Sequence, residues 1–178
     1  NLEKMLLKSN ADAFLISTPT STRFEVAMQV IESDRIAIVE KPLCTSPSEM
    51  DALLTAARTR KLPLYTAFHP AYGREVDWWR EQREARNFDL GALLGFDTCF
   101  ADPYYIDGKL TLGAVGKAGA WTDSGASGLS ALSRLIDPAT IRLVDGRMTI
   151  IPSLGCAQVQ GLGIYSFIEQ DRTGFGMV

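Results

Sequence analysis

A lysine held between a glutamate and a proline is the residue in this sequence best suited to acid–base chemistry. Lys41 lies in the tripeptide Glu40-Lys41-Pro42, directly after the apolar run Ile36–Val39. The residue before a proline is pushed out of the helical region, so the lysine amine is held in one direction and could share a proton with a substrate hydroxyl. A surface lysine paired with Glu40 is the alternative, and the tripeptide alone favours it.

Three further polar residues could contribute to chemistry. His69 is the only histidine, and its position directly after an apolar segment suits catalysis and a structural role equally. Asp123 and Ser127 lie four residues apart at the expected start of a helix, so their side chains share one face and could both point at a substrate. Asp123 could instead cap that helix. Gly125 and Gly128 indicate that another group packs very closely there, a bulky helix being one explanation.

Residues 12–68 must position the first of these groups, because apolar segments alternate there with amphipathic ones. Both amphipathic segments begin with the spacing of a capping box, formed by Thr22 and Glu25 in the first and by Ser46 and Glu49 in the second. Short connections of this kind predict parallel strands with right-handed crossovers. The expected elements are strands at 12–17, 36–39 and 64–68 and helices at 22–31 and 46–60.

The carboxyl ends of these strands carry the polar residues. Ligands of open parallel sheets bind beyond that edge. The turn at 17–20, the tripeptide at 40–42 and His69 should therefore be neighbours on one rim of the sheet.

The remainder of the chain has the pattern of an α+β unit. Helices are expected at about 71–86 and 124–136, with a loop at 101–120 between them. Strands are expected at 93–100, 141–151, 157–169 and 173–178, which predicts a large, mostly antiparallel open sheet. We therefore predict an α/β chain with half of a doubly wound, Rossmann-type parallel sheet at 1–69 and an α+β domain at 70–178. Half a sheet exposes an apolar edge and the last strand ends without a turn, so we expect a chain cut at both ends.

Composition excludes several classes of protein. With 178 residues, 46% hydrophobic and 22% charged, the chain has globular proportions. A net charge of −3 argues against a nucleic-acid or anionic-membrane partner, and no apolar run is long enough to span a membrane. The three cysteines are far apart and form no CxxC pair, so we expect no metal site, no disulfide framework and a cytoplasmic location.

Four aromatic residues could stack on a sugar, although packing or a subunit contact is the more common use of tryptophan: Trp78, Trp79, Tyr104 and Tyr105.

Three motifs together resemble a known family. They are Ser17-Thr18-Pro19-Thr20-Ser21-Thr22-Arg23, Glu40-Lys41-Pro42-Leu43 and Asp123-Ser124-Gly125-Ala126-Ser127-Gly128-Leu129-Ser130. Their order and spacing are similar to those of the glucose–fructose oxidoreductase / inositol dehydrogenase family, the Gfo/Idh/MocA group.

This resemblance implies an N-terminal Rossmann domain, a C-terminal open-sheet domain that often mediates oligomerisation, and hydride transfer between NAD or NADP and a carbon of a sugar or polyol. It implies that Lys41 contacts the reacting hydroxyl. It further implies that His69 and Asp123 are catalytic and bind substrate together with Ser127. The implied cofactor-binding residues are Ser17, Thr18, Pro19, Thr20, Arg23, Glu40 and Lys41.

Two positions depart from the family pattern. Most members carry histidine where this chain has Ser127 and aspartate where it has Ser130, and serine cannot act as a general base at neutral pH. The branch that resembles D-galactose and L-arabinose 1-dehydrogenases also lacks that histidine and has one at the position of His69. The resemblance therefore favours an aldose 1-dehydrogenase that forms an aldonolactone. A polyol or inositol dehydrogenase and a cofactor-free sensor or scaffold remain alternatives.

The glycine-rich phosphate turn is missing from the sequence. No GxGxxG occurs in the chain, and by resemblance it should lie upstream, with the acidic residue that selects NAD over NADP. We therefore expect that these residues alone do not bind a dinucleotide tightly. The long C-terminal strands make a homodimer through the sheet plausible.

Overall fold

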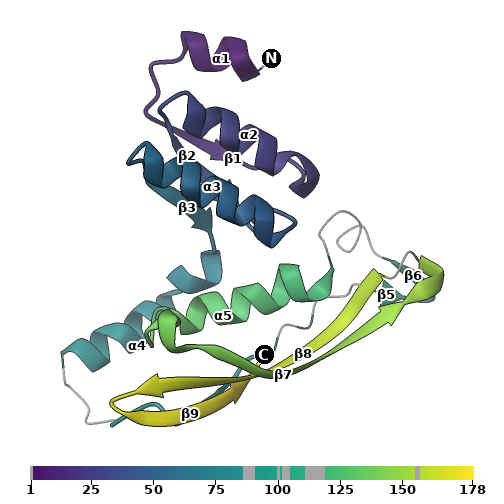
Figure 1. Cartoon of the computed structure of the whole chain (residues 1–178). Helices are drawn as coiled ribbons and strands as arrows, with labels where there is room; N and C mark the ends of the chain where they lie inside the picture. The colour runs from purple at the N-terminus through teal and green to yellow at the C-terminus, as the bar shows by residue number, and fades with distance from the viewer. Residues whose placement is uncertain (1, 86–90, 100, 102–104, 111–118, 155–156) are drawn as a thin grey trace. The chain divides into compact units, whose positions relative to one another are not determined.

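The computed structural model describes residues 2–85, 91–99, 101, 105–110, 119–154 and 157–178. The chain divides into two compact units, one up to Ala67 and one from Phe68 onward, and each is described here by itself (Figure 1).

A parallel sheet forms the centre of the first unit. Its described strands are β1 (Ala13–Ile16), β2 (Ile36–Glu40) and β3 (Leu64–Ala67), in the order β1-β2-β3. They alternate with the helices α1 (Leu2–Lys8), α2 (Thr20–Glu32) and α3 (Pro47–Thr59). The predicted half of a Rossmann-type sheet is thus confirmed.

Apolar residues of α2, α3 and the strands build the core of this unit. Helices α2 and α3 pack against each other. The residues without solvent exposure are Ala27, Val30, Ile31, Ala37, Val39 and Leu53. In contrast, Leu15 of the outer strand β1 is 69% exposed.

The two predicted capping boxes have different outcomes. The box at α3 is confirmed, because Ser46 Oγ accepts the Glu49 N–H while the Glu49 carboxylate accepts the Ser46 N–H, with Pro47 at the first helical position. The box at Thr22 is wrong: α2 begins at Thr20, no side chain caps it, and the Thr22 hydroxyl donates to Pro19 O at 3.0 Å.

A mixed sheet forms the second unit. Its described strands lie in the order β4-β9-β8-β7, where only the β4–β9 pair is parallel. Figure 1 shows β7, β8 and β9. The strands are β4 (Gly95–Asp97), β7 (Arg142–Ile151), β8 (Ala157–Glu169) and β9 (Arg172–Met177). The prediction of a mostly antiparallel sheet is confirmed. The described part of β4 is shorter than the expected 93–100.

The elements of the second unit differ from expectation in three places. The first expected helix is broken at Gly73 into the short helix η1 (His69–Tyr72) and α4 (Arg74–Glu84). The expected loop at 101–120 contains a small hairpin, β5 (Tyr105–Ile106) and β6 (Lys109–Leu110). The second expected helix starts with a π-helical turn, η2 (Trp121–Gly125), and continues as α5 (Ala126–Leu132). Asp123 lies inside that turn, so its predicted alternative role as a helix cap is wrong.

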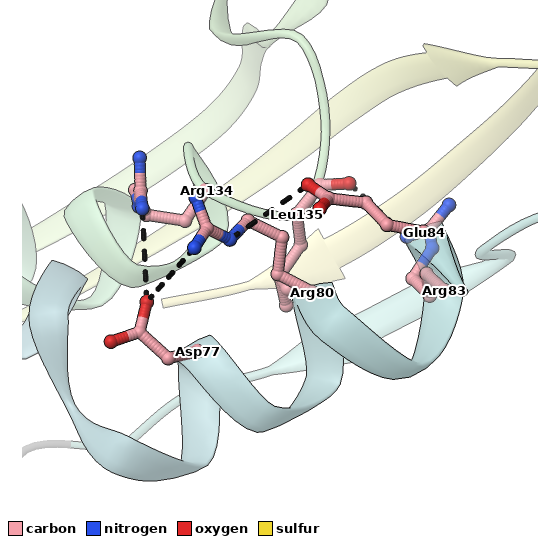
Figure 2. Close-up of polar contacts among 6 residues, drawn as sticks. All are labelled: Asp77, Arg80, Arg83, Glu84, Arg134 and Leu135. Carbon is pink, nitrogen blue, oxygen red and sulfur yellow. Dashed lines mark hydrogen bonds and ion pairs between the residues drawn. The ribbon is translucent and has the colours of Figure 1, made fainter.

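An ion-pair network fixes α4 against the end of α5. Asp77 lies 3.7 Å from both Arg80 and Arg134, and Arg80 lies 3.9 Å from Glu84 (Figure 2). The Arg134 guanidinium also lies over the Tyr72 ring, 5.1 Å from its centroid. The network links the helix surface of α4 to the turn that follows α5.

A second set of contacts ties the end of α4 to β8. Arg83 donates to Leu135 O at 3.1 Å (Figure 2) and forms an ion pair with Glu169. The same carboxylate accepts the Leu93 N–H. These partly buried contacts hold α4, α5 and the sheet as one unit.

Glycines make room for aromatic rings on the inner face of the sheet. The Trp121 ring covers Gly161 and Gly163, where an added Cβ would lie 2.8 and 2.6 Å from it. Trp121 also stacks on Tyr165, with ring centroids 6.2 Å apart. The same ring crowds Gly125, at 2.8 Å.

No described helix of the chain is both long and apolar enough to cross a membrane.

Candidate functional site

The polar residues of the first unit lie at one edge of its sheet, as predicted from topology. Ser17 and Thr18 follow β1, and Lys41 follows β2. The last paired residues, Ile16 and Val39, are direct neighbours. The two loops therefore leave the sheet side by side.

Arg23 bridges these two loops. Its Nε donates to Thr18 O at 2.8 Å and its terminal nitrogen donates to Pro42 O, also at 2.8 Å. The side chain is only 9% exposed. A guanidinium suits this position because its donors form a rigid planar fork that can serve two acceptors at once.

The edge also holds a buried hydroxyl. Thr18 Oγ1 is shielded from solvent and has no hydrogen-bond partner within the described residues. Buried hydroxyls are normally satisfied, so this atom is available to an incoming polar group. Thr20, at the start of α2, is 5% exposed, whereas Ser17 and Pro19 are exposed.

Lys41 is half-buried, and its backbone N–H donates to the Glu40 carboxylate at 3.1 Å. The Glu40 carboxylate therefore stabilises the backbone of the turn that carries Lys41.

In the second unit, Asp123 and Ser127 are both buried, each with 3% exposure. The Ser127 hydroxyl donates to the backbone carbonyl of Asp123 at 3.1 Å. The serine one turn further on behaves alike, with Ser130 Oγ donating to Ser127 O at 2.7 Å. These hydroxyl protons are therefore committed to the helix, which leaves only lone pairs for another partner.

His69 is exposed at the first position of η1, two residues after β3. Helix η1 packs against α5, so the segments that carry His69 and Ser127 are neighbours within the second unit. The structure therefore forms two groups of the predicted residues. One surrounds Lys41 in the first unit, and the other lies on η1, η2 and α5 in the second.

The close packing predicted at the helix glycines is present, and it comes from individual side chains and not from a bulky neighbouring helix. The Trp121 ring covers Gly125, and a Cβ on Gly128 would lie 2.5 Å from Thr98 Oγ1 and 3.1 Å from a Val178 methyl. Trp121 precedes Gly125 by four residues within η2. Thr98 and Val178 directly follow β4 and β9, which are distant from Gly128 along the chain, so no local pattern predicted these two partners.

A cavity of about 760 Å³ in the second unit was also absent from the sequence predictions. The Trp121 ring, Ser124, Thr98 and Gln160 contribute to its wall. It lies beside the start of η2, on the sheet side of the helix.

The aromatic candidates have separate surroundings. Trp78 and Trp79 are about half exposed, at 49% and 44%, and contact each other edge to face. Tyr104 lies outside the described residues.

Within the described part of the chain, no group of three or more histidine, cysteine or acidic side chains could hold a metal ion, and Cys44 and Cys99 are free thiols.

Comparison with known proteins finds a family match for the first unit. Residues 1–68 match the model of the Gfo/Idh/MocA oxidoreductase family, described as an NAD-binding Rossmann fold. This agrees with the resemblance of the sequence motifs. A search of curated proteins finds no match.

Solved structures match both units. GenD2 from gentamicin A biosynthesis, in complex with NAD, is 24% identical with a TM-score of 0.73 over 99% of this chain and 50% of its own. The 3-ketoreductase KijD10 from Actinomadura kijaniata, with NADP and TDP-benzene, is 20% identical with a TM-score of 0.75 over 98% of this chain and 52% of its own. Myo-inositol 2-dehydrogenase from Lactobacillus plantarum is 16% identical with a TM-score of 0.71 over 99% and 53%. The chain thus shares the fold of these enzymes and spans about half their length.

Proposed function

We propose that this chain is part of an NAD(P)-dependent oxidoreductase of the Gfo/Idh/MocA family that acts on a CH–OH group, with Lys41 at the reacting hydroxyl. The observation that carries the proposal is the position of Lys41 at the carboxyl end of β2, within the segment that matches the family model. Matched structures bound to NAD or NADP support the choice of cofactor.

The edge of the first sheet fits a dinucleotide. Ligands of open parallel sheets bind beyond the carboxyl ends of the strands, where Thr18 Oγ1 is buried without a partner among the described residues. Thr18, Thr20, Glu40 and Lys41 are the residues we assign to the nicotinamide side. NAD(P), when bound, would supply the hydride acceptor.

We assign to Lys41 the role of accepting the proton of the substrate hydroxyl. Oxidation of an alcohol removes a hydride from carbon and a proton from the hydroxyl, and the lysine amine is the group that takes this proton, directly or through a water. Its backbone N–H bond to Glu40 and the buried Pro42 next to it limit where that amine can move. By the family resemblance, we assign Asp123 and His69 of the second unit to substrate hydroxyls.

The substrate we favour is an aldose oxidised at C1 to an aldonolactone, similar to galactose or arabinose. Support comes from Ser127 in place of a histidine and from His69 two residues after β3. Because the Ser127 proton is committed to Asp123 O, Ser127 can only accept from a sugar hydroxyl. A polyol or inositol is the alternative substrate, and the myo-inositol 2-dehydrogenase among the matched structures supports it.

The test is NAD(P)H formation by the intact protein with a panel of aldoses and polyols. Lys41→Met should abolish turnover and leave cofactor affinity nearly unchanged, whereas Lys8→Met, an exposed lysine at the end of α1, should change neither. Lactone formed from an aldose supports the finer proposal, and a ketone formed from a polyol supports the alternative. Substantial turnover by Lys41→Met would remove Lys41 from its assigned role.

A cofactor-free sensor or scaffold is the rival of a different class. It is favoured by the loss of a histidine at position 127. A folded intact protein that neither reduces NAD(P) with any substrate nor binds it would establish this rival.

We also propose that the outer face of the second sheet forms a homodimer. Apolar side chains on that face are 42–56% exposed: Leu162, Ile168, Phe175 and Met177. Side chains alternate between faces and opposed antiparallel partners share a face, so the register of β8 with β9 gathers these residues together. Phe175→Glu should shift sedimentation toward the monomer, while Leu7→Glu on α1 should not.

A further inference from the structure

A buried arginine connects the two loops that carry the proposed cofactor and proton-transfer residues. Arg23 lies in the first turn of α2 and donates to Thr18 O and to Pro42 O. Thr18 belongs to the loop after β1, and Pro42 immediately follows Lys41. One side chain thus holds a backbone carbonyl in each loop.

These bonds account for the burial of the charge. Backbone carbonyl oxygens in loops beyond a sheet have no strand partner and need another hydrogen-bond donor. A buried guanidinium in turn needs hydrogen-bond acceptors. The two hydrogen bonds from Arg23 therefore satisfy the carbonyl oxygens and the buried guanidinium at the same time. The two acceptors are 24 residues apart in sequence, from Thr18 to Pro42.

Because the guanidinium points to backbone carbonyls, it acts on the site through the loops. We propose that Arg23 is a positioning residue: it sets the distance between the cofactor loop at 17–20 and the turn that carries Lys41. This inference rests on the proposed function for its catalytic part and differs from direct cofactor binding by Arg23, which the family resemblance implies. Losing it should misplace Lys41 relative to the reacting hydroxyl.

The experiment compares Arg23→Ala and Arg23→Lys with Arg60→Met in the intact protein. Arg60 pairs with Asp34 at the surface, at the opposite end of the sheet before β3 begins. Three quantities are measured: kcat, the Kd of NAD(P)H by fluorescence, and hydrogen exchange of peptides covering 17–23 and 40–46.

The expected result separates turnover from binding. A misplacement of about 1 Å costs roughly 10²-fold in rate, so kcat of Arg23→Ala should fall by about that factor while Kd changes by less than about 3-fold, a difference below 1 kcal/mol. Exchange should accelerate in both loops, and added guanidinium ion should restore part of kcat. Lysine, a point charge without the planar fork, should recover only part of the loss.

Two outcomes would overturn the proposal. A Kd that rises in step with the loss of activity would make Arg23 a direct cofactor ligand. If Arg23→Ala shows the same hydrogen exchange and the same kcat as Arg60→Met, Arg23 does not hold the two loops together. If the unaltered protein shows no NAD(P)-dependent activity, the proposed function fails, and the exchange of the two loops alone decides whether Arg23 holds them together.

Discussion

Adding one methyl group at Gly174 is expected to destabilise the second unit by about 1–3 kcal/mol. A Cβ built on Gly174 would lie 2.3 Å from Phe167 Cζ and 2.7 and 2.8 Å from the adjacent ring carbons. An ordinary carbon–carbon contact is about 3.5 Å, so the ring would have to retreat by about 1.2 Å. Phe167 has 0% exposure and packs against Leu132 and Ile136, so no free space is available for that movement.

Gly146→Ala is the matched control on the same sheet. Its Cβ would meet nothing closer than Leu162 O at 3.5 Å, an ordinary contact. Replacing such a glycine restricts the unfolded chain, so we expect a neutral effect or a gain of about 0.4–1 kcal/mol. The two substitutions add the same methyl group and differ only in the space that receives it.

Urea unfolding followed by tryptophan fluorescence is a suitable assay, because all three tryptophans, Trp78, Trp79 and Trp121, lie in the second unit. A second variant tests the cause. In Gly174→Ala combined with Phe167→Leu, the smaller side chain vacates part of the space, so the double variant should lose about 0.5–3 kcal/mol less than the sum of the single losses. An unfolding midpoint of Gly174→Ala equal to that of Gly146→Ala would refute the packing argument.

Two further predictions concern the start of α3. Ser46→Ala should reduce the stability of the first unit by about 1 kcal/mol, because it removes the acceptor for the Glu49 N–H; hydrogen exchange of the α3 amides measures it, and unchanged exchange would contradict it. Hydrogen bonds from the Thr45 backbone and hydroxyl hold the pKa of Glu49 below its ordinary value. A lowered pKa in the folded state means that the stabilisation is present above the ordinary carboxylate pKa and is lost as pH falls through the lower folded value. Stability of the wild-type first unit should therefore fall more steeply in acid than that of Glu49→Gln, whose amide can still accept from Ser46 but does not titrate; parallel pH profiles would contradict this.

Local patterns predicted those features of the fold that depend on neighbouring residues. The capping box at Ser46 was correct because the serine, the proline and the glutamate of one helical turn satisfy each other. The same pattern at Thr22 failed because α2 begins two residues earlier, at Thr20. In that helix Arg23 reaches Thr18 O and Pro42 O, and the latter contact lies outside any local pattern.

The position of the candidate site was predictable from the sequence, but the state of its side chains was not. Topology alone correctly brought the loop after β1 and the Lys41 turn to one edge of the sheet, since parallel strands share the direction of their carboxyl ends. The state of the individual groups was not predictable. Thr18 Oγ1 is buried without a partner in the described structure, and the Ser127 proton is committed to a backbone carbonyl.

The sequence by itself determined the alternation of strands and helices, the parallel direction of β1, β2 and β3, and the edge where Lys41 lies. Those features follow from side-chain periodicity and chain connectivity, which act over a few residues at a time. Only the tertiary structure decided that Arg23 spans two loops and that Trp121 lies across glycines of η2 and β8. Such contacts join residues far apart in the chain, and they form only where packing leaves a hydrogen-bond acceptor exposed to a donor or a gap wide enough for a ring.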